Sequence, residues 1–434
     1  MAVSIRTIGR ALADLVGPGA VSDEGGTLAA AGIDGLTPRW VVTPASLEHA
    51  ATVVALAHEE HLAVAPRGGG HALELGGVPA RLDVVLDLRR LDRVLEDSPA
   101  DLVVTVQAGI TAGALADRLA ARRQWLPLDP PAWRRRTLGG LCATNASGPL
   151  RQRYGTLRDL LLGVRFVQAD GVLTWGGAKV VKSVTGYDVP KLMTGSLGTL
   201  GVLGELTLRL HPAPEAAGAW LATFTDVRAA REFVARLTDS TVQPNRVELL
   251  DAVALQACGA AGHAGIAVGI GSVAEAVRAQ GEQVTALATR AGGRVTPVTE
   301  AFWTAYEAAA LGGDTTLRVS VPPTAVPEAV AAVRRATAPF ARPPLIHGCA
   351  ALGALAVVIG GVPGHAVAAG VETLRDAIAG PGGSVVVARA PRAVRERVDA
   401  WGPVAPEVQT IMRRLKETFD PERVLNPGRF VGGL

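Results

Sequence analysis

The sequence predicts an α+β protein of two domains, and three observations lead to this prediction. The chain has 434 residues, which is too long for one ordinary hydrophobic core. Up to about residue 214, a β-α-β segment is followed by alternating strands and a hairpin. From about residue 216, strands alternate with helices in an order that suits an antiparallel sheet covered on one face by helices.

The composition is that of a compact protein and argues against a nucleic-acid binder. Hydrophobic residues make up 48% and charged residues 19%, the net charge is only +3, and no basic block is interleaved with aromatic residues. Cys142, Cys258 and Cys349 are widely spaced and form no CxxC pair, so we expect neither disulfides nor an iron–sulfur cluster. We expect a cytoplasmic protein without a transmembrane segment. Attachment to the inner face of the membrane through a partner stays open.

The first elements follow directly from residue spacing. Apolar residues at helical spacing predict a helix over Ile5–Val16, which Gly17-Pro18-Gly19 ends. Trp40–Val42 reads as a strand, and Thr43-Pro44 supplies the N-cap and first-turn chemistry of the helix that follows. Leu62–Ala65 then predicts a second strand.

The loop Pro66-Arg67-Gly68-Gly69-Gly70-His71 is the first candidate site. Three successive glycines remove every β-carbon, so backbone N–H groups can approach an anion closely, and Arg67 adds a fixed cation. A plain turn is the alternative. Because no helix opens directly behind the glycines, the loop differs from the fingerprint of nicotinamide-binding Rossmann domains.

A second candidate loop runs from Thr137 to Gly148 and contains small residues throughout. A flat ligand could lie against its backbone, with Thr144, Asn145 and Ser147 as polar contacts; the alternative is a small-residue turn packed inside a domain. The three prolines of Leu126–Pro131 predict a shaped loop just before it. Asp170-Gly171 predicts a type I′ hairpin after it.

In this order, the motifs resemble the FAD-binding domain of the vanillyl-alcohol-oxidase and p-cresol-methylhydroxylase (PCMH-type) flavoprotein family. Within the family, the resemblance is closest to FAD-binding subunits of the glycolate oxidase type. The residues that carry it are Pro66–His71, Asp129-Pro130-Pro131, Thr137–Gly148, Arg153-Tyr154-Gly155, Asp170-Gly171, Val180–Leu192, Gly195–Glu205, Phe419-Asp420-Pro421 and Leu425–Arg429.

The resemblance implies a domain plan. A docking helix and loop (1–33) precede a two-subdomain FAD-binding domain (34–214), a substrate or cap domain follows (215–400), and a C-terminal segment (401–434) returns to the FAD domain.

It also implies that Arg67–His71 wraps the FAD pyrophosphate, Thr137–Asn145 holds the flavin and ribityl region, and Gly198–Val202 meets the adenine end. The cofactor-binding residues expected on this basis are Pro66, Arg67, Gly68, Gly69, Gly70, His71, Asp129, Pro130, Thr137, Leu138, Gly139, Gly140, Ala143, Thr144, Asn145, Gly148, Gly198, Gly201, Val202 and Asn426.

His71 has two interpretations. Some family members bond the flavin 8α-methyl group to a histidine at this point of the loop, whereas relatives of the glycolate oxidase type have Thr or Ser and bind FAD noncovalently. A histidine that only forms hydrogen bonds near phosphate or flavin is the simpler alternative.

Oxidation of a 2-hydroxy acid requires a cation for the carboxylate and a base for the hydroxyl proton. We expect Arg318 to supply the first and His347 the second. The alternatives are a solvated or ion-paired arginine and a structural histidine. Relatives that oxidise D-2-hydroxy acids on a single chain carry His-x-Gly-Asp-Gly-Asn-x-His, whereas this chain has His347 followed by Gly-Cys-Ala-Ala-Leu-Gly, so we expect no metal there.

The function expected from the sequence is therefore that of an FAD-dependent oxidoreductase acting on the CH–OH group of a small 2-hydroxy acid. By resemblance, it passes electrons to a partner, in a complex with a second flavoprotein subunit and an iron–sulfur subunit. Two alternatives stay open. One is a free-standing oxidase of another alcohol or amine with FAD attached to His71, and the other is a noncatalytic FAD-binding subunit.

Overall fold

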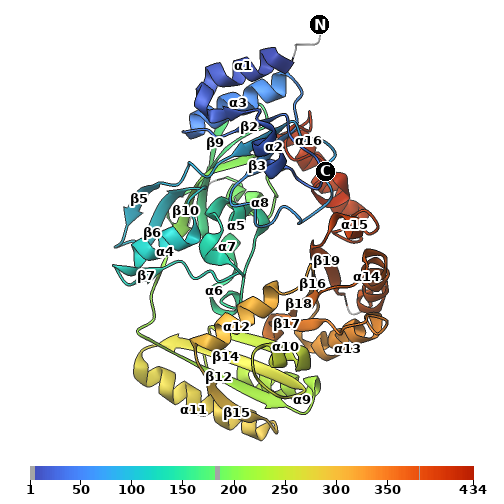
Figure 1. Ribbon diagram of the computed structural model, residues 1–434. Helices are drawn as coiled ribbons and strands as arrows, with labels where there is room; N and C mark the ends of the chain where they lie inside the picture. Colours follow the sequence, from blue (N-terminus) through green and yellow to red (C-terminus); the bar gives the residue numbers. More distant parts are fainter. Residues whose placement is uncertain (1–4, 181–185, 381) are drawn as a thin grey trace.

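The computed structural model describes residues 5–180, 186–380 and 382–434 and confirms the predicted α+β fold with two domains (Figure 1). The chain builds the first domain, crosses to the second near residue 215 and returns to the first through its C-terminal helix. Residues 181–185 of the motif Val180–Leu192, including Lys182, lie outside the described residues.

The first domain contains a mixed sheet with strand order β1-β2-β4-β3. Strand β4 is buried along its length and lies parallel to both neighbours, as is usual for a strand covered on both faces. The strands are β1 (Val21–Ser22), β2 (Trp40–Val42), β3 (Val64–Arg67) and β4 (Val84–Asp87), and the helices around them are α1 (Ile5–Val16), α2 (Gly25–Ala31) and α3 (Leu47–Glu59).

Helix α3 begins later than predicted. Its N-cap is Ser46, whose hydroxyl accepts a hydrogen bond from the His49 backbone N–H at 3.1 Å. The backbone N–H of Thr43 instead donates to the carbonyl of Ala20 at 2.8 Å. The prediction of an N-cap at Thr43-Pro44 was therefore wrong, because Thr43 is held by the neighbouring chain segment.

A second, antiparallel sheet of the first domain has strand order β5-β6-β10-β8-β9. Asp170-Gly171 lies in the turn of the β8–β9 hairpin, so the predicted hairpin is present. Gly171 has a φ of 87°, but Asp170 does not have a positive φ, so the predicted type I′ turn, which needs positive φ at both central residues, was wrong. The strands are β5 (Val94–Ser98), β6 (Val103–Gln107), β8 (Leu161–Val167), β9 (Leu173–Gly177) and β10 (Val202–Arg209), and β7 (Gln124–Trp125) pairs separately with β11 (His211–Pro212). The helices of this part are α4 (Ala112–Ala120), α5 (Leu138–Thr144), α6 (Arg151–Tyr154), α7 (Leu157–Leu160) and α8 (Val189–Met193).

The small-residue segment after Thr137 forms helix α5. The Thr137 hydroxyl caps it by accepting a hydrogen bond from the Gly140 N–H at 3.3 Å, and Asn145 ends it in a left-handed conformation with a φ of 43°. A β-carbon on Gly139 would lie 2.8 Å from that of Ala108. The small residues therefore allow the helix to pack closely, and its first turn lies beside the glycine loop.

The second domain is built on an eight-stranded antiparallel sheet with strand order β15-β12-β14-β13-β17-β18-β16-β19. Its strands are β12 (Ala216–Phe224), β13 (Arg246–Asp251), β14 (Ala264–Ser272), β15 (Arg294–Val298), β16 (Thr315–Ser320), β17 (Leu345–Cys349), β18 (Ala354–Ile359) and β19 (Ser384–Arg389). Its helices are α9 (Val227–Thr238), α10 (Ala252–Ala257), α11 (Ala274–Arg290), α12 (Glu300–Leu311), α13 (Val326–Ala336), α14 (Gly364–Ala379) and α15 (Arg392–Arg395).

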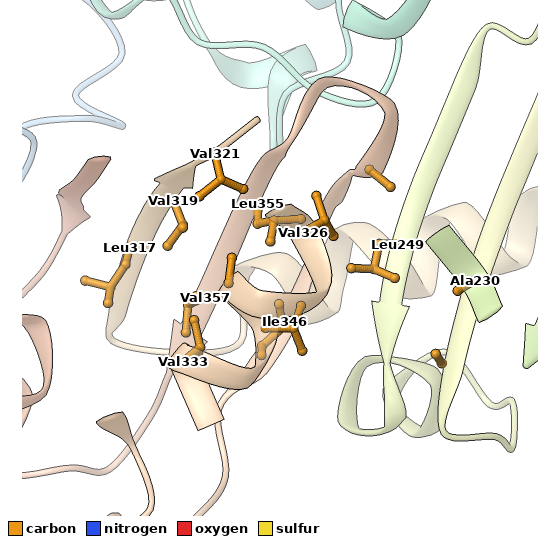
Figure 2. Packing of buried hydrophobic residues seen from close by; sticks show 14 of the residues in the cluster. Ala230, Leu249, Leu317, Val319, Val321, Val326, Val333, Ile346, Leu355 and Val357 are labelled. Carbon is orange, nitrogen blue, oxygen red and sulfur yellow. The ribbon is translucent and has the colours of Figure 1, made fainter. Parts of the chain in front are cut away.

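The two faces of this sheet differ. Helices α9, α11, α13 and α14 cover one face over a large aliphatic core, part of which Figure 2 shows with Leu249, Ile346 and Val357. On the opposite face, α10 and α12 cover only a smaller cluster that includes Leu250, Leu255 and Trp303. The rest of that second face is free to meet the first domain.

Neither strand β13 nor helix α10 is predicted from the sequence. The strand pairs with both β14 and β17 and so lies inside the sheet. Its charged residues Arg246, Glu248 and Asp251 hide the apolar alternation by which buried strands are recognised.

The C-terminal helix α16 (Pro406–Phe419) leads the chain back to the first domain. Val64 of β3 donates its N–H to the Val424 carbonyl at 2.8 Å and accepts a hydrogen bond from the Asn426 N–H at 3.0 Å. The tail thereby extends the first sheet beside β3, the strand that carries the glycine loop.

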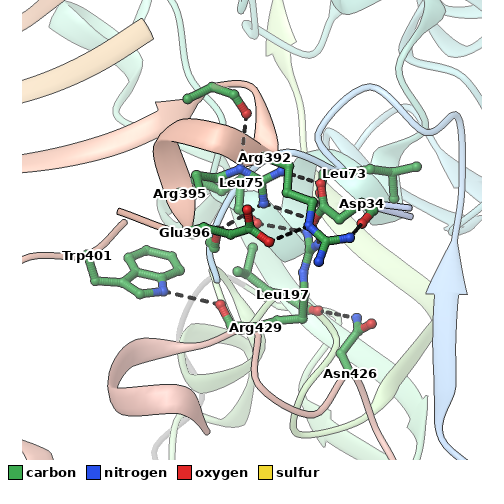
Figure 3. Close-up of polar contacts among 12 residues, drawn as sticks. Asp34, Leu73, Leu75, Leu197, Arg392, Arg395, Glu396, Trp401, Asn426 and Arg429 are labelled. Atoms are coloured by element: carbon green, nitrogen blue, oxygen red, sulfur yellow. Dashed lines mark hydrogen bonds and ion pairs between the residues drawn. The ribbon is translucent and has the colours of Figure 1, made fainter. Parts of the chain in front are cut away.

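A buried charge cluster ties the two domains together (Figure 3). The Asp34 carboxylate of the first domain accepts hydrogen bonds from Arg395, the last residue of α15, and from Arg429 of the tail. Arg429 also donates to the carbonyls of Leu73 and Leu75 at 2.7 and 2.8 Å. One carboxylate therefore holds the second domain, the tail and the segment after His71 in one place.

Candidate active site

A cavity of about 640 Å³ lies between the two domains. The first domain lines it with the segment after the glycine loop and the loops on either side of α5, and the second domain with the less covered face of its sheet. The sequence-predicted residues that line it are His71, Asp129, Pro130, Asn145, Gly148, Arg318 and His347.

A second, smaller cavity of about 60 Å³ lies within the first domain, where the glycine loop meets α5 and the loop before β10. The sequence-predicted residues that line it are Pro66, Arg67, Gly68, Thr137, Gly139, Gly140, Ala143, Gly198 and Gly201. Residues from three separate parts of the chain are thus brought together here.

Six expected cofactor-binding residues do not line either cavity, namely Gly69, Gly70, Leu138, Thr144, Val202 and Asn426. Leu138 and Val202 are fully buried in the hydrophobic core. The Asn426 side chain donates to the Leu197 carbonyl at 2.8 Å, so it holds the loop that contains Gly198. The Thr144 hydroxyl donates to the Gly140 carbonyl at 2.7 Å within α5.

Asp129 links the domains from the edge of the large cavity. One carboxylate oxygen accepts the Leu150 N–H at 2.8 Å, and the other accepts Nε of Arg246 in β13 at 3.0 Å. Burial raises the pKa of Asp129, and the Arg246 charge opposes that rise. Asp129 therefore connects the first domain to β13 of the second domain.

The small cavity has the chemistry of an anion site. A β-carbon on Gly68 would lie 2.1 Å from the Thr137 hydroxyl, so the two loops approach more closely than any side chain permits. Nε of Arg67 is buried without a hydrogen-bond partner in the described part of the chain, and no carboxylate lines the cavity. Backbone N–H groups beside one arginine suit a diphosphate.

Both loops extend from the small cavity to the large one. Gly68 lines the first and His71 the second, and along the other loop Ala143 lines the first and Asn145 the second. A ligand held by both loops can therefore reach from the anion site into the space between the domains. An elongated dinucleotide such as FAD fits this arrangement.

Three polar cavity residues of the second domain project from one face of its sheet. Alternate residues of a strand point to opposite faces. Glu248 in β13, Arg318 in β16 and His347 in β17 line the cavity, whereas their neighbours Leu249 and Leu317 lie in the aliphatic core. The pleat of three different strands thus places one carboxylate, one guanidinium and one imidazole in the same wall.

His347, Tyr306 and Glu248 form a buried hydrogen-bonded chain. The Tyr306 hydroxyl, from α12, contacts the Glu248 carboxylate and lies 2.7 Å from Nδ1 of His347. The three residues are only 8%, 7% and 2% exposed. Nε2 of His347 has no hydrogen-bond partner among the described residues, and the residue lines the cavity.

Burial sets the charge of this chain of groups. It lowers the pKa of His347 to about 4, so the imidazole is neutral at pH 7. It raises the pKa of Glu248 to about 8, against the effect of the Tyr306 hydrogen bond. It also raises the pKa of Tyr306 well above its usual value, so the phenol stays protonated.

Three arginines from the two domains make the lining of the cavity positively charged. Arg136, Arg151 and Arg318 line it, and none of them has an ion pair within the described part of the chain. Burial and the charge of Arg318 lower the pKa of Arg136 to about 10; burial and the charge of Arg151 lower that of Arg318. The Arg318 side chain is exposed and lines the cavity. This concentration of positive charge suits an anionic ligand.

His71 lies on the opposite, first-domain side of the cavity. Burial and the charges of Arg136 and Arg135 lower its pKa, so its imidazole is neutral at pH 7. A neutral imidazole facing the cavity can form hydrogen bonds or act as a nucleophile.

Sequence reasoning missed Glu248, Tyr306, Arg136 and Arg151 as cavity residues. Arg151 stands in the arginine-rich segment before Tyr154, and Arg136 directly precedes the α5 N-cap, but nothing local shows that either side chain faces a cavity. Recognition of β13 as a strand would have placed Arg246 and Glu248 on one face.

Comparison with known proteins gives two family matches. Residues 38–177 match the model of an FAD binding domain, and residues 213–384 and 403–430 match that of the C-terminal domain of FAD linked oxidases.

Curated relatives match over about half of the chain's length. The probable mitochondrial D-lactate dehydrogenase of Danio rerio is 36% identical over 225 residues, which are 51% of this chain and 45% of that protein. Glycolate oxidase subunit GlcD of Bacillus subtilis is 30% identical over 214 residues, 49% of this chain and 46% of that protein. The matches thus span less than half the length of these relatives.

Solved structures show the same fold over nearly the whole chain. A p-cresol methylhydroxylase superposes with a TM-score of 0.79 at 17% identity, covering 98% of this chain and 96% of that one. An alkyldihydroxyacetonephosphate synthase gives 0.74 at 19% identity, covering 99% and 89%. Within the described residues, every helix is too short or too polar to cross a membrane.

Proposed function

We propose that this chain, which belongs to the FAD-linked oxidases and has FAD as its cofactor, oxidises a small 2-hydroxy acid. The reaction takes place in the cavity between its two domains. The observation that carries the proposal is one cavity that contains both the neutral imidazole of His347 and three arginines without ion pairs in the described part of the chain. The carboxylate of a 2-hydroxy acid needs a cation to bind it, and the hydroxyl group on the adjacent carbon needs a proton acceptor.

Arg318 binds the substrate carboxylate, and Arg136 and Arg151 strengthen the positive field around it. Nε2 of His347 accepts the hydroxyl proton as general base, because it has no hydrogen-bond partner among the described residues and burial keeps the ring uncharged. Bound FAD supplies the acceptor for the two electrons and the hydrogen of the substrate C–H bond.

The electrons then pass to a partner. Support comes from the segment after His347, where Cys349 and Ala350 stand instead of a metal-binding carboxylate, and from the named relative that is a glycolate oxidase subunit. On this proposal the working enzyme is a complex with a second flavoprotein subunit and an iron–sulfur subunit.

His71 supports a second candidate, a free-standing oxidase with covalently attached FAD. The residue lines the large cavity and its lowered pKa leaves the ring neutral and nucleophilic. Acid precipitation separates the candidates. Yellow colour in the pellet, lost in His71→Ala, supports covalent attachment, whereas colour in the supernatant supports the glycolate oxidase type.

Substitution of Arg318 tests the proposed substrate class. In Arg318→Met, the concentration of glycolate or D-lactate that half-saturates anaerobic flavin reduction should rise by about 10- to 100-fold, because a charge-assisted hydrogen bond is lost. The control is Arg228→Met, which removes a surface arginine of α9 that is 81% exposed. Equal half-saturating concentrations in the two variants would contradict the role of Arg318.

A further inference from the structure

We propose that Tyr306 and Glu248 form a proton relay behind His347, which selects the tautomer of the imidazole and takes up the proton removed from the substrate. The inference rests on the proposed function, since it assumes that a hydroxyl proton arrives at Nε2. It assigns positioning roles to two residues that lie behind the base.

The direction of the hydrogen bonds determines what His347 can do. A neutral histidine carries one proton, and the hydrogen bond at one nitrogen fixes the state of the other. When Glu248 is ionised, Tyr306 donates to it, and the phenol oxygen then accepts the proton of Nδ1, 2.7 Å away. Nε2 is left as a lone pair facing the cavity, and His347 is a base.

When Glu248 is protonated, every bond in the relay reverses. The carboxylic acid donates to the phenol oxygen, Tyr306 donates to Nδ1, and the ring proton resides on Nε2. His347 then presents a donor to the cavity and cannot accept the substrate proton. The ionisation of Glu248 therefore decides which tautomer faces the substrate.

The same relay completes the proton transfer. The substrate hydroxyl proton bonds to Nε2, the Nδ1 proton passes to the Tyr306 oxygen, and the phenol proton passes to Glu248. One proton has entered at Nε2 and one has reached the carboxylate, so His347 ends neutral. This matters because all three residues are buried, and a lasting imidazolium would be costly there.

The surroundings of Glu248 allow it to hold that proton. Arg151 and Arg246 favour its ionised form, whereas Asp129 and burial oppose it; the Cys349 thiol, whose pKa is raised to about 12, remains uncharged. Burial dominates and places the pKa of Glu248 at about 8. The carboxylate thus changes state within the range where an enzyme works, and Tyr306 remains neutral throughout.

Tautomer measurement by ¹⁵N NMR on histidine-labelled protein, with His347→Gln for assignment, tests the relay without any turnover. Wild type should change from the Nε2–H to the Nδ1–H tautomer with a midpoint near pH 8. Tyr306→Phe and Glu248→Gln should lose this transition. Tyr154→Phe is the matched control, because its hydroxyl accepts a hydrogen bond from Asn245 at 3.2 Å and lies outside the chain of His347, Tyr306 and Glu248. A single tautomer from pH 6 to 10 in wild type, or a transition that persists in Tyr306→Phe, would overturn the proposal.

Flavin reduction gives the second readout. The limiting rate of flavin reduction in wild type should rise with pH around the same midpoint. The rate of Tyr306→Phe should be at least about tenfold lower at high pH and should not depend on pH. Its half-saturating substrate concentration should stay within about threefold of the wild-type value. If wild type is reduced and Tyr306→Phe and Glu248→Gln keep its pH profile, the relay is wrong. If no 2-hydroxy acid reduces wild type at any pH, the proposed function fails while the tautomer result still stands.

Discussion

Gly68 shows how a single missing side chain shapes the candidate site. Its α-carbon faces the Thr137 hydroxyl so closely that a β-carbon would lie 2.1 Å from that oxygen. Thr137 also caps α5, so the contact fixes the glycine loop against the first turn of that helix. Any larger residue must separate the two loops that form the small cavity.

We therefore predict that Gly68→Ala lowers the affinity for FAD by more than about tenfold. Both loops contact the same ligand, and losing the hydrogen bonds from one of them costs at least about 1.4 kcal/mol of binding free energy. Quenching of flavin fluorescence measures it. Gly25→Ala is the control, because a β-carbon there meets no atom within 4 Å. Unchanged affinity in Gly68→Ala would mean that the cofactor does not lie between these loops.

Glu248 makes stability depend on pH in a defined direction. Its pKa is raised to about 8 in the folded protein, from 4.5 in an unfolded chain. The folded state therefore binds more protons in this range, and the free energy of unfolding falls as pH rises from about 5 to 8. Glu248→Gln cannot ionise, so the melting temperature of the variant relative to wild type should increase with pH. A constant difference from pH 5 to 9 would contradict the assignment.

At the scale of elements, sequence reasoning succeeded where the evidence is local. The glycine loop, the hairpin at Asp170-Gly171 and helix α1 each follow from neighbouring residues. Helix α5 was not recognised because its small residues resemble those of a turn, and their reason is close packing against Ala108. Strand β13 was missed because Arg246 and Glu248 face a cavity between the domains, which a sequence pattern cannot distinguish from solvent.

Helix α16 depends on one buried lysine. Nζ of Lys416 donates to Asp420 at 2.6 Å and to the carbonyls of Thr199 and Leu425 at 2.8 and 3.0 Å. We predict that Lys416→Met destabilises the protein by about 3–5 kcal/mol, because Asp420 is left buried without its cation. Thermal unfolding should show this loss, whereas Arg413→Met on the exposed face should change little. Similar melting temperatures for both variants would refute the prediction.

At the scale of the whole molecule, the active site exists only because two domains are held together. The relay residues are 41 and 58 positions apart along the chain, and the arginines opposite them belong to the other domain or to other strands. The sequence identified Arg318 and His347 as candidates by the needs of the chemistry. Sequence reasoning could not identify Tyr306 or Glu248, because these residues come into contact only when helix α12 packs against strand β13 in the folded protein.

The Asp34 cluster should control how firmly the domains are joined. In Asp34→Asn, Arg395 and Arg429 keep their charges in a buried place without a counterion. We expect limited proteolysis to cut the variant near the domain crossing at residue 215 at least about tenfold faster than wild type. This ratio corresponds to a loss of roughly 1.4 kcal/mol in the free energy that keeps the two domains closed. Asp376→Asn, at an exposed site of α14, is the control. Equal cleavage rates would show that other contacts hold the domains.

The most direct test of the account is one anaerobic absorbance experiment on the purified chain. After titration with FAD and removal of the excess, we predict one flavin per chain and loss of the oxidised flavin band when glycolate or D-lactate is added. A chain that binds no FAD would contradict the whole account. A chain that binds FAD but keeps its oxidised spectrum, alone and in the reconstituted complex, would contradict the proposed chemistry and favour a noncatalytic FAD-binding subunit.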